Sequence, residues 1–122
     1  MEILQTLGIP FALLADQDTG LSKKGDANMA LFTVSTVIDG DTFEVSGGWK
    51  WKGQNGSRVR PTGYDAPELH EYGGQAANEK LARLILGQQV ELRAAHRVDR
   101  GRLVSDVYYN GKYLADYFPE YQ

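Results

Sequence analysis

The stretch Arg60-Pro-Thr-Gly-Tyr-Asp-Ala-Pro-Glu68 contains one arginine and two carboxylates. Proline and glycine within it favour a turn, so these charges are expected in a connection between regular elements. A guanidinium fork binds phosphate oxygens through paired hydrogen bonds, whereas carboxylates bind metal ions or accept protons. The stretch therefore has the residue types needed to act on a phosphate ester.

Two charged residues elsewhere in the chain extend this group. Asp41 closes the turn Asp39-Gly40-Asp41, and Arg102 follows a later loop. Carboxylates at separate strand ends can converge on one hard cation such as calcium, with carbonyls and waters completing its shell. The alternative is that Asp39, Asp41 and Asp65 only form turns. The arginines at 60 and 102 favour a phosphate site, because phosphate is the ligand that uses a cation and guanidinium forks together.

The elements that must position these residues can be read from the pattern of apolar residues. β-Branched and aromatic runs predict strands at 32–38 and 42–46, a third around Arg58 to Arg60, and two more at 89–94 and 103–109. The third is expected to follow a turn at Asn55-Gly56 and to lie at a sheet edge or bulge at Pro61. Helical spacing of apolar residues predicts one helix over 74–87, ending at Gly87. Its core face consists of Ala77, Leu81, Leu84 and Ile85.

This order of elements predicts the fold class. Five strands with one helix between the third and fourth is the order of the OB-fold, a Greek-key β-barrel in the α+β class that commonly binds oligonucleotides. An SH3-like barrel is the second possibility, and the mid-chain helix counts against it. The 122 residues have room for one domain, which we assign to residues 31–122.

Residues 1–30 are predicted to form an N-terminal arm and a polar linker. The apolar part ends in Ala-Leu-Leu-Ala, as a signal peptide would, but Glu2 precedes it and no Lys or Arg does. An appended arm is therefore favoured over a signal peptide. No apolar run reaches the roughly 20 residues of a membrane helix, so no membrane partner is expected. With no cysteine, the chain has neither disulfides nor thiolate metal sites.

The charge of the chain is unevenly distributed. The net charge of −3 argues against a protein that coats nucleic acid. Between Gly48 and Arg102, however, there are ten Lys and Arg residues and only six Asp and Glu residues, so the net charge of this part is +4. A locally basic middle on an acidic chain can still attract a polyanion.

Four segments resemble the staphylococcal nuclease (thermonuclease) family, in the same order and at nearly the same spacing. They are VIDGDTFEV (37–45), RVRPTGYDAPE (58–68), GGQAANEKLARLILGQQVELR (73–93) and DRGRLVSDVYYNGK (99–112). The resemblance extends from about Phe32 to Phe118. It implies an OB-fold nuclease that uses calcium (Ca2+) to hydrolyse DNA, RNA or both, leaving 3′-phosphate and 5′-hydroxyl ends. It also suggests a secreted or cell-envelope protein.

The resemblance also implies a role for each matching residue. The metal ligands fall on Asp41, Asp65 and the backbone carbonyl of Ala66, where the family often has threonine. The catalytic residues are Glu68, which orients or deprotonates water, and the phosphate-binding Arg60 and Arg102. The rival hypothesis is a non-catalytic OB-fold module that binds nucleic acid or a protein partner. The retained acidic and arginine residues favour the enzyme.

The chain departs from the family in two places. The segment VDRGR (98–102) is one residue shorter than usual and lacks a tyrosine. Relatives also continue with helices over the barrel, so a barrel ending in LADYFPEYQ is expected to expose apolar surface. We expect residues 1–15 to cover that surface, either in the same chain or in a neighbour's, giving a monomer or an arm-exchanged homodimer.

Several other residues invite a functional role but favour a simpler one. Trp49 and Trp51 are expected to pack in the core rather than to stack on bases. His70 lies two residues after Glu68 and could act as a general acid, although the family needs none. His96 is expected to be solvated, or at most to contact a phosphate.

Overall fold

The structure is a computed structural model and describes residues 30–122. The described chain consists of strands, one α-helix and two short 3-10 helices, in this order: β1 (Ala30–Asp39), β2 (Thr42–Trp51), β3 (Gln54–Pro61), α1 (Gly74–Ile85), β4 (Gln89–Asp99), β5 (Arg102–Tyr109), β6 (Lys112–Tyr113), η2 (Leu114–Tyr117) and η3 (Pro119–Tyr121). The predicted order of three strands, a helix and two strands is confirmed, and the two-residue β6 is added after it. Among these residues, no helix is long and apolar enough to cross a membrane.

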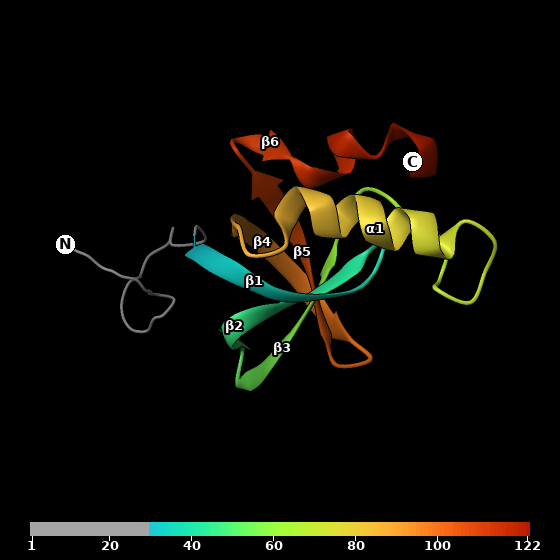
Figure 1. The fold of residues 1–122 in the computed structure, drawn as a ribbon. Coiled ribbons are helices and arrows are strands. Elements are labelled where there is room, and N and C mark those ends of the chain that lie inside the picture. Colours follow the sequence, from blue (N-terminus) through green and yellow to red (C-terminus); the bar gives the residue numbers. More distant parts are fainter. Residues whose placement is uncertain (1–29) are drawn as a thin grey trace.

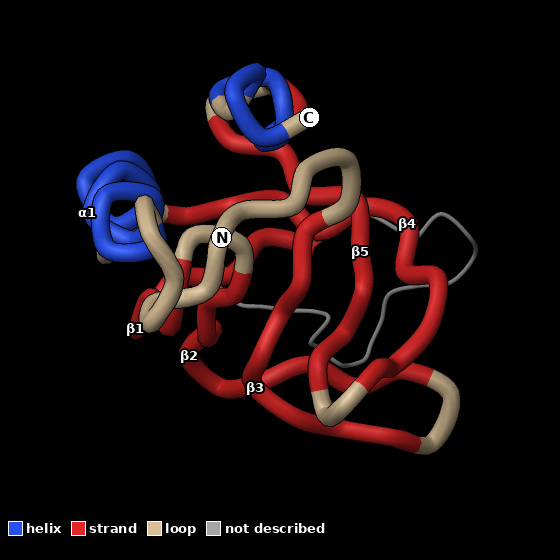
Figure 2. Tube along the Cα trace, turned by 90° about the vertical axis from the view of Figure 1, so that its right-hand side faces the viewer, coloured by secondary structure: helices blue, strands red, loops and turns tan. Residues whose placement is uncertain are grey.

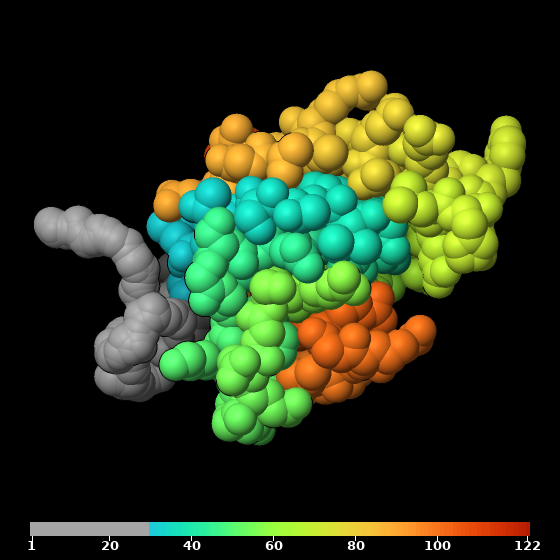
Figure 3. All heavy atoms as spheres, turned by 60° about the horizontal axis from the view of Figure 1, so that its bottom comes forward, coloured from blue at the N-terminus to red at the C-terminus, as the bar shows by residue number. Residues whose placement is uncertain are grey.

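The strands close into a barrel (Figures 1 and 2). Neighbouring strands follow the order β3-β2-β1-β4-β5-β6, and a further pairing of β3 with β5 joins the two sides. That closing pairing is parallel and matches Arg58 with Arg102 and Pro61 with Ser105, whereas the other pairings are antiparallel. In the space-filling view, β3 (green) lies against the hairpin of β4 and β5 (orange), as this pairing requires (Figure 3). A closed five-stranded barrel with one helix between β3 and β4 confirms the predicted OB-like α+β fold.

The core fills the barrel and the space between it and α1. Alternate strand residues such as Phe43, Val59 and Val107 are fully buried, as period-two patterning requires. The helix buries Ala77, Leu81 and Ile85 completely and Leu84 partly, so its predicted core face is confirmed. Each fully buried large apolar side chain stabilises the fold by about 1.5–3 kcal/mol. The helix ends as expected, with Gly87 in the left-handed region at φ 78°.

The turn between β2 and β3 differs from the prediction. It lies at Lys52-Gly53, whose φ angles are 48° and 79°, and Asn55-Gly56 is instead paired within β3. Gly56 serves packing there, because a Cβ at this position would lie 2.8 Å from the ring of Trp49. Trp49 is buried and its indole N–H donates to the Arg58 carbonyl at 2.8 Å, which confirms the core assignment for Trp49. Trp51 is half-buried and packs against the core.

Pro61 lies at a local edge of the sheet, as the sequence predicts. The pairing of β3 with β2 reaches only Val59, so Pro61 has a strand neighbour on the β5 side alone. A residue without an N–H group fits such a local edge.

The segment LADYFPEYQ buries apolar side chains of its own, and the expected exposure of apolar surface elsewhere on the barrel stays a prediction. Residues Leu114, Ala115 and Phe118 are all fully buried, and the Phe118 ring stacks on Tyr64 with centroids 4.6 Å apart. These side chains are turned inward by the two short 3-10 helices η2 and η3 and the residue between them. The predicted docking of residues 1–15, and the monomer or exchanged dimer it implies, concern residues outside those described.

Candidate functional site

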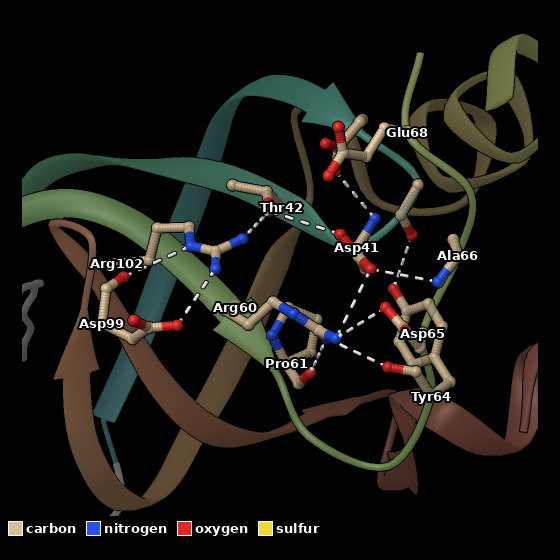
Figure 4. A network of polar contacts seen from close by, with 12 residues as sticks. Asp41, Thr42, Arg60, Pro61, Tyr64, Asp65, Ala66, Glu68, Asp99 and Arg102 are labelled. Atoms are coloured by element: carbon tan, nitrogen blue, oxygen red, sulfur yellow. Dashed lines mark hydrogen bonds and ion pairs between the residues drawn. The ribbon is translucent and has the colours of Figure 1, made fainter. Parts of the chain in front are cut away.

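Arg60, near the end of β3, contacts residues on both sides of the candidate site (Figure 4). Its Nη2 atom lies 3.1 Å from Oδ1 of Asp65 and 3.5 Å from Oδ2 of Asp41. Its Nη1 atom donates to the carbonyls of Pro61 at 2.7 Å and Tyr64 at 3.0 Å. The guanidinium group is therefore fixed by the loop that follows it and faces two carboxylates, one of them from the turn after β1.

Asp41 is the buried carboxylate of the pair. The backbone N–H of Ala66 donates to its Oδ2 atom at 3.0 Å, and the Thr42 hydroxyl donates to its Oδ1 atom at 3.4 Å. Burial raises the pKa of Asp41 from 3.8 to about 6, against the opposing effect of the Arg60 charge, and Asp39 raises it further. The fold thus holds a carboxylate in a position that disfavours its charge, which is typical of functional sites.

Asp65 and Ala66 lie in the loop between β3 and α1. The Asp65 side chain is 87% exposed, and its backbone N–H donates to the Tyr121 carbonyl at 3.0 Å, so η3 anchors the loop. Ala66 is buried and is joined to Asp41 through its amide. The resemblance implies a ligand role for the Ala66 carbonyl, and that role stays a prediction.

Arg102, the first residue of β5, is held at the other side of the site. Its Nη2 atom lies 3.3 Å from Oδ2 of Asp99, and its Nη1 atom donates to the Thr42 hydroxyl at 3.3 Å. Since Thr42 in turn donates to Asp41, a short polar relay connects Arg102 to the buried carboxylate. Parallel pairing of β3 and β5 brings this arginine to the same side of the barrel as Arg60.

Glu68 is more loosely placed than the other candidates. Its side chain is 64% exposed, and its Oε1 atom lies 3.7 Å from Nδ1 of His70. Its backbone N–H donates to Oε1 of Glu71 at 2.7 Å. It borders the same cleft as the arginines.

All six predicted site residues line one cleft of about 590 Å³. The wall also includes residues that sequence reasoning did not assign to the site, namely Asp39, Thr62, Gly63, Tyr64, Glu71, Arg97, Asp99 and Arg100. The signal for Asp99 in the sequence is its position three residues before Arg102, and in the structure the two side chains form an ion pair. Tyr64 carries none. Its hydroxyl donates to the Gly40 carbonyl at 2.8 Å and ties the loop to the turn before Asp41.

The donor set fits a hard cation in part. Oxygens of Asp41 and Asp65 converge on one cationic nitrogen, Nη2 of Arg60, and oxygen is the donor that calcium prefers. Within residues 30–122, no group of three or more His, Cys, Asp or Glu side chains forms a metal cluster. Carbonyls and waters would have to supply the remaining ligands.

Comparison with known proteins does not assign the chain to a family. No protein-family model matches the chain, and a search of curated proteins gives no significant match.

Proposed function

We propose that the chain is a calcium-dependent phosphodiesterase of the staphylococcal nuclease type that hydrolyses DNA, RNA or both. One observation carries the proposal: two arginines and two carboxylates from separate parts of the chain meet in one cleft, and Arg60 contacts both carboxylates. The motif resemblance of residues 32–118 supports it, because the matching positions are the ones that meet. The expected products end in 3′-phosphate and 5′-hydroxyl groups.

The protein groups take complementary roles in this proposal. Arg60 and Arg102 hold phosphate oxygens, since a planar fork bonds two oxygens at once and guanidinium remains charged. Glu68 orients or deprotonates the attacking water, which displaces the 5′-oxygen in line. Asp41 and Asp65, with the Ala66 carbonyl, would hold calcium. When bound, that ion neutralises negative charge on the phosphate as the transition state forms.

The burial of the site supports these roles. The side chains of Arg60 and Arg102 are only 20% and 19% exposed, so their attraction to a phosphate is less screened than at an open surface. Their present carboxylate partners hold them in place before substrate arrives. A guanidinium group fixed in advance loses less conformational entropy on binding.

The test is cleavage of end-labelled single-stranded DNA and of end-labelled single-stranded RNA, each with millimolar calcium and with a chelator. We expect cleavage only with calcium, and 3′ ends that a phosphatase converts to hydroxyls. Asp41→Ala should lower the rate at least about a hundredfold, or ~2.7 kcal/mol. Asp116→Ala removes an exposed carboxylate of η2 and serves as the matched control, with a rate close to that of the wild type.

Binding without cleavage would reverse the conclusion. If the wild type binds the labelled strand but leaves it intact with calcium, the protein is the non-catalytic OB-fold module. A protein that neither binds nor cleaves excludes both nucleic-acid functions.

A further inference from the structure

A chain of four polar side chains lies behind the loop that carries Asp65. Thr62 comes from the loop itself, and His96, Asp106 and Tyr113 come from β4, β5 and β6. The Thr62 hydroxyl donates to Oδ1 of Asp106 at 2.7 Å, and Nε2 of His96 lies 2.9 Å from the same oxygen. The Tyr113 hydroxyl lies 2.6 Å from Oγ1 of Thr62. Three strands are thus joined to one loop residue, and we call these four side chains the anchor network.

The chemistry of the groups fixes the direction of each hydrogen bond. An ionised carboxylate only accepts, so both Thr62 and His96 donate to Asp106. The Thr62 proton is then in use, and Tyr113 must donate to the Thr62 oxygen. Burial would raise the pKa of Asp106, but hydrogen bonds from Thr62 and His96 outweigh it and lower that pKa. Successive donors of this kind polarise and strengthen one another.

The loop is held on its inner side as well. Arg60 donates to the carbonyls of Pro61 and Tyr64, and the Thr62 backbone N–H donates to the Ser105 carbonyl at 3.0 Å. Gly63 has φ 96°, and a Cβ there would lie 2.6 Å from the Tyr113 hydroxyl. Only glycine fits at this point of the loop, and a movement of the loop away from β6 would break the Thr62 hydrogen bonds.

We propose that the anchor network positions the active site, with Thr62 and Asp106 as positioning residues whose side-chain hydrogen bonds set the place of Arg60 and Asp65. Its effect on turnover rests on the proposed function. None of the four residues belongs to the set that the resemblance implies. A small displacement of Arg60 matters because misplacement of a catalytic group by about 1 Å can cost on the order of a hundredfold in rate.

The test compares Thr62→Val with Thr62→Ser. Valine keeps the β-branched shape and removes the hydroxyl, whereas serine keeps the hydroxyl. We expect Thr62→Val to lower kcat about tenfold with KM changed less than about twofold, as for a group that acts only in the transition state. Thr62→Ser should restore kcat to within about threefold of the wild type. Asp106→Asn keeps an acceptor but loses charge assistance, and should lower kcat about threefold.

Amide hydrogen exchange provides a readout that does not depend on activity. The Ala66 amide reports the assembled site through its bond to Asp41, so its exchange should rise at least about tenfold in Thr62→Val while core amides of β5 keep their rates. A loss of global stability would raise both. Thr33→Val, an exposed position of β1, is the matched control and should change neither.

The outcomes separate this inference from the proposed function. If folded Thr62→Val and Asp106→Asn both keep wild-type kcat and wild-type Ala66 exchange, the anchor network does not position the site. If the wild type proves inactive with calcium, the proposed function fails. Ala66 exchange then decides the positioning role alone.

Discussion

Arg60 brings opposite charges together because its two terminal nitrogens have different partners. Nη1 is bound to loop carbonyls, and Nη2 faces Asp41 and Asp65. This explains at residue scale why RPTGYDAPE combines one cation with two carboxylates. The arginine organises the loop and also balances part of the negative charge of the aspartates, while the burial of Asp41 leaves its ionised form disfavoured.

The raised pKa of Asp41 predicts a gain in stability when its charge is removed. The folded state keeps the Asp41 proton up to about pH 6, whereas the unfolded chain releases it near 3.8. The contribution of Asp41 to stability therefore falls as pH rises from about 4 to about 6. In a chelator at pH 7, we expect Asp41→Asn to raise the free energy of unfolding by roughly 1–3 kcal/mol. Urea unfolding at pH 4, 5, 6 and 7 measures this.

Asp65→Asn is the control for that measurement. Because this side chain is mostly exposed, the change should stay within about 0.5 kcal/mol at every pH. An Asp41→Asn protein less stable than the wild type at pH 7 would show that the carboxylate contributes more through its hydrogen bonds than it costs through burial.

A second prediction at this scale concerns the arginine fork. Lysine keeps the charge but offers one nitrogen, which cannot serve the loop carbonyls and the carboxylates as Arg60 does. Arg60→Lys and Arg102→Lys should each lower the nuclease rate at least about tenfold, or ~1.4 kcal/mol. Arg58 is exposed, lies on the same strand as Arg60 and pairs with Glu44 of β2. The control substitution Arg58→Lys should leave the rate unchanged. Normal turnover in either site variant would remove that arginine from the mechanism.

At the scale of elements, the site lies where the β1–β2 turn, the loop after β3 and α1 meet. Gly40 is the contact point: a Cβ there would lie 2.6 Å from the Cβ of Ala77 and 2.7 Å from that of Ala66. The helix and the loop can approach the turn closely only because residue 40 lacks a side chain. This approach places the amide of Ala66 within hydrogen-bond distance of Asp41.

The substitution Gly40→Ala tests the importance of that approach. The added methyl group must push α1 or the loop away, which should cost about 1–3 kcal/mol of stability and lower nuclease activity with it. Thermal melts and cleavage rates measure the two effects. Gly53→Ala, in the β2–β3 turn, meets no atom within 4 Å but has φ 79°, so it should cost some stability and no activity. Equal activity loss in both variants would contradict the role of the close contact.

For the whole molecule, the closed barrel matters because it brings distant segments to one side. Pairing of β3 with β5 sets Arg102 beside the stretch that contains Arg60, and the C-terminal 3-10 helices bury Phe118 against Tyr64. A ligand that joins Asp41 to Asp65 would therefore tie together the turn, the loop and the barrel.

Calcium should accordingly stabilise the entire fold. A ligand that binds only the native state adds about 2.7 kcal/mol at a hundred times its dissociation constant. We expect millimolar calcium to raise the melting temperature of the wild type and to have no such effect on Asp41→Asn. Glu79→Gln, on the exposed face of α1, is the control and should respond as the wild type does. A wild-type melting temperature indifferent to calcium would argue against a metal site.

Local patterns in the sequence are enough to predict the five main strands, the helix and the local part of the site. Strand and helix positions follow from residue periodicity and backbone sterics, which act over a few residues, and so α1 with its core face and glycine end was predicted. The arrangement of Arg60, Asp65 and Ala66 was also accessible, because they lie within one turn-rich stretch. The turn at Lys52-Gly53 differs from the predicted one because Asn55-Gly56 carries the stronger local turn signal, whereas the fit of Gly56 to Trp49 places that pair within β3.

Properties that depend on segments far apart in the chain could not be predicted from local patterns. The raised pKa of Asp41 is a consequence of burial, which many neighbours create together. The contacts of Thr62 with Asp106 and Tyr113 span 44 and 51 residues and depend on which strands pair. The cover provided by Phe118 likewise requires the closed barrel beneath it. Local sequence patterns do not predict such contacts, because the contacts contribute free energy only when the whole chain has folded.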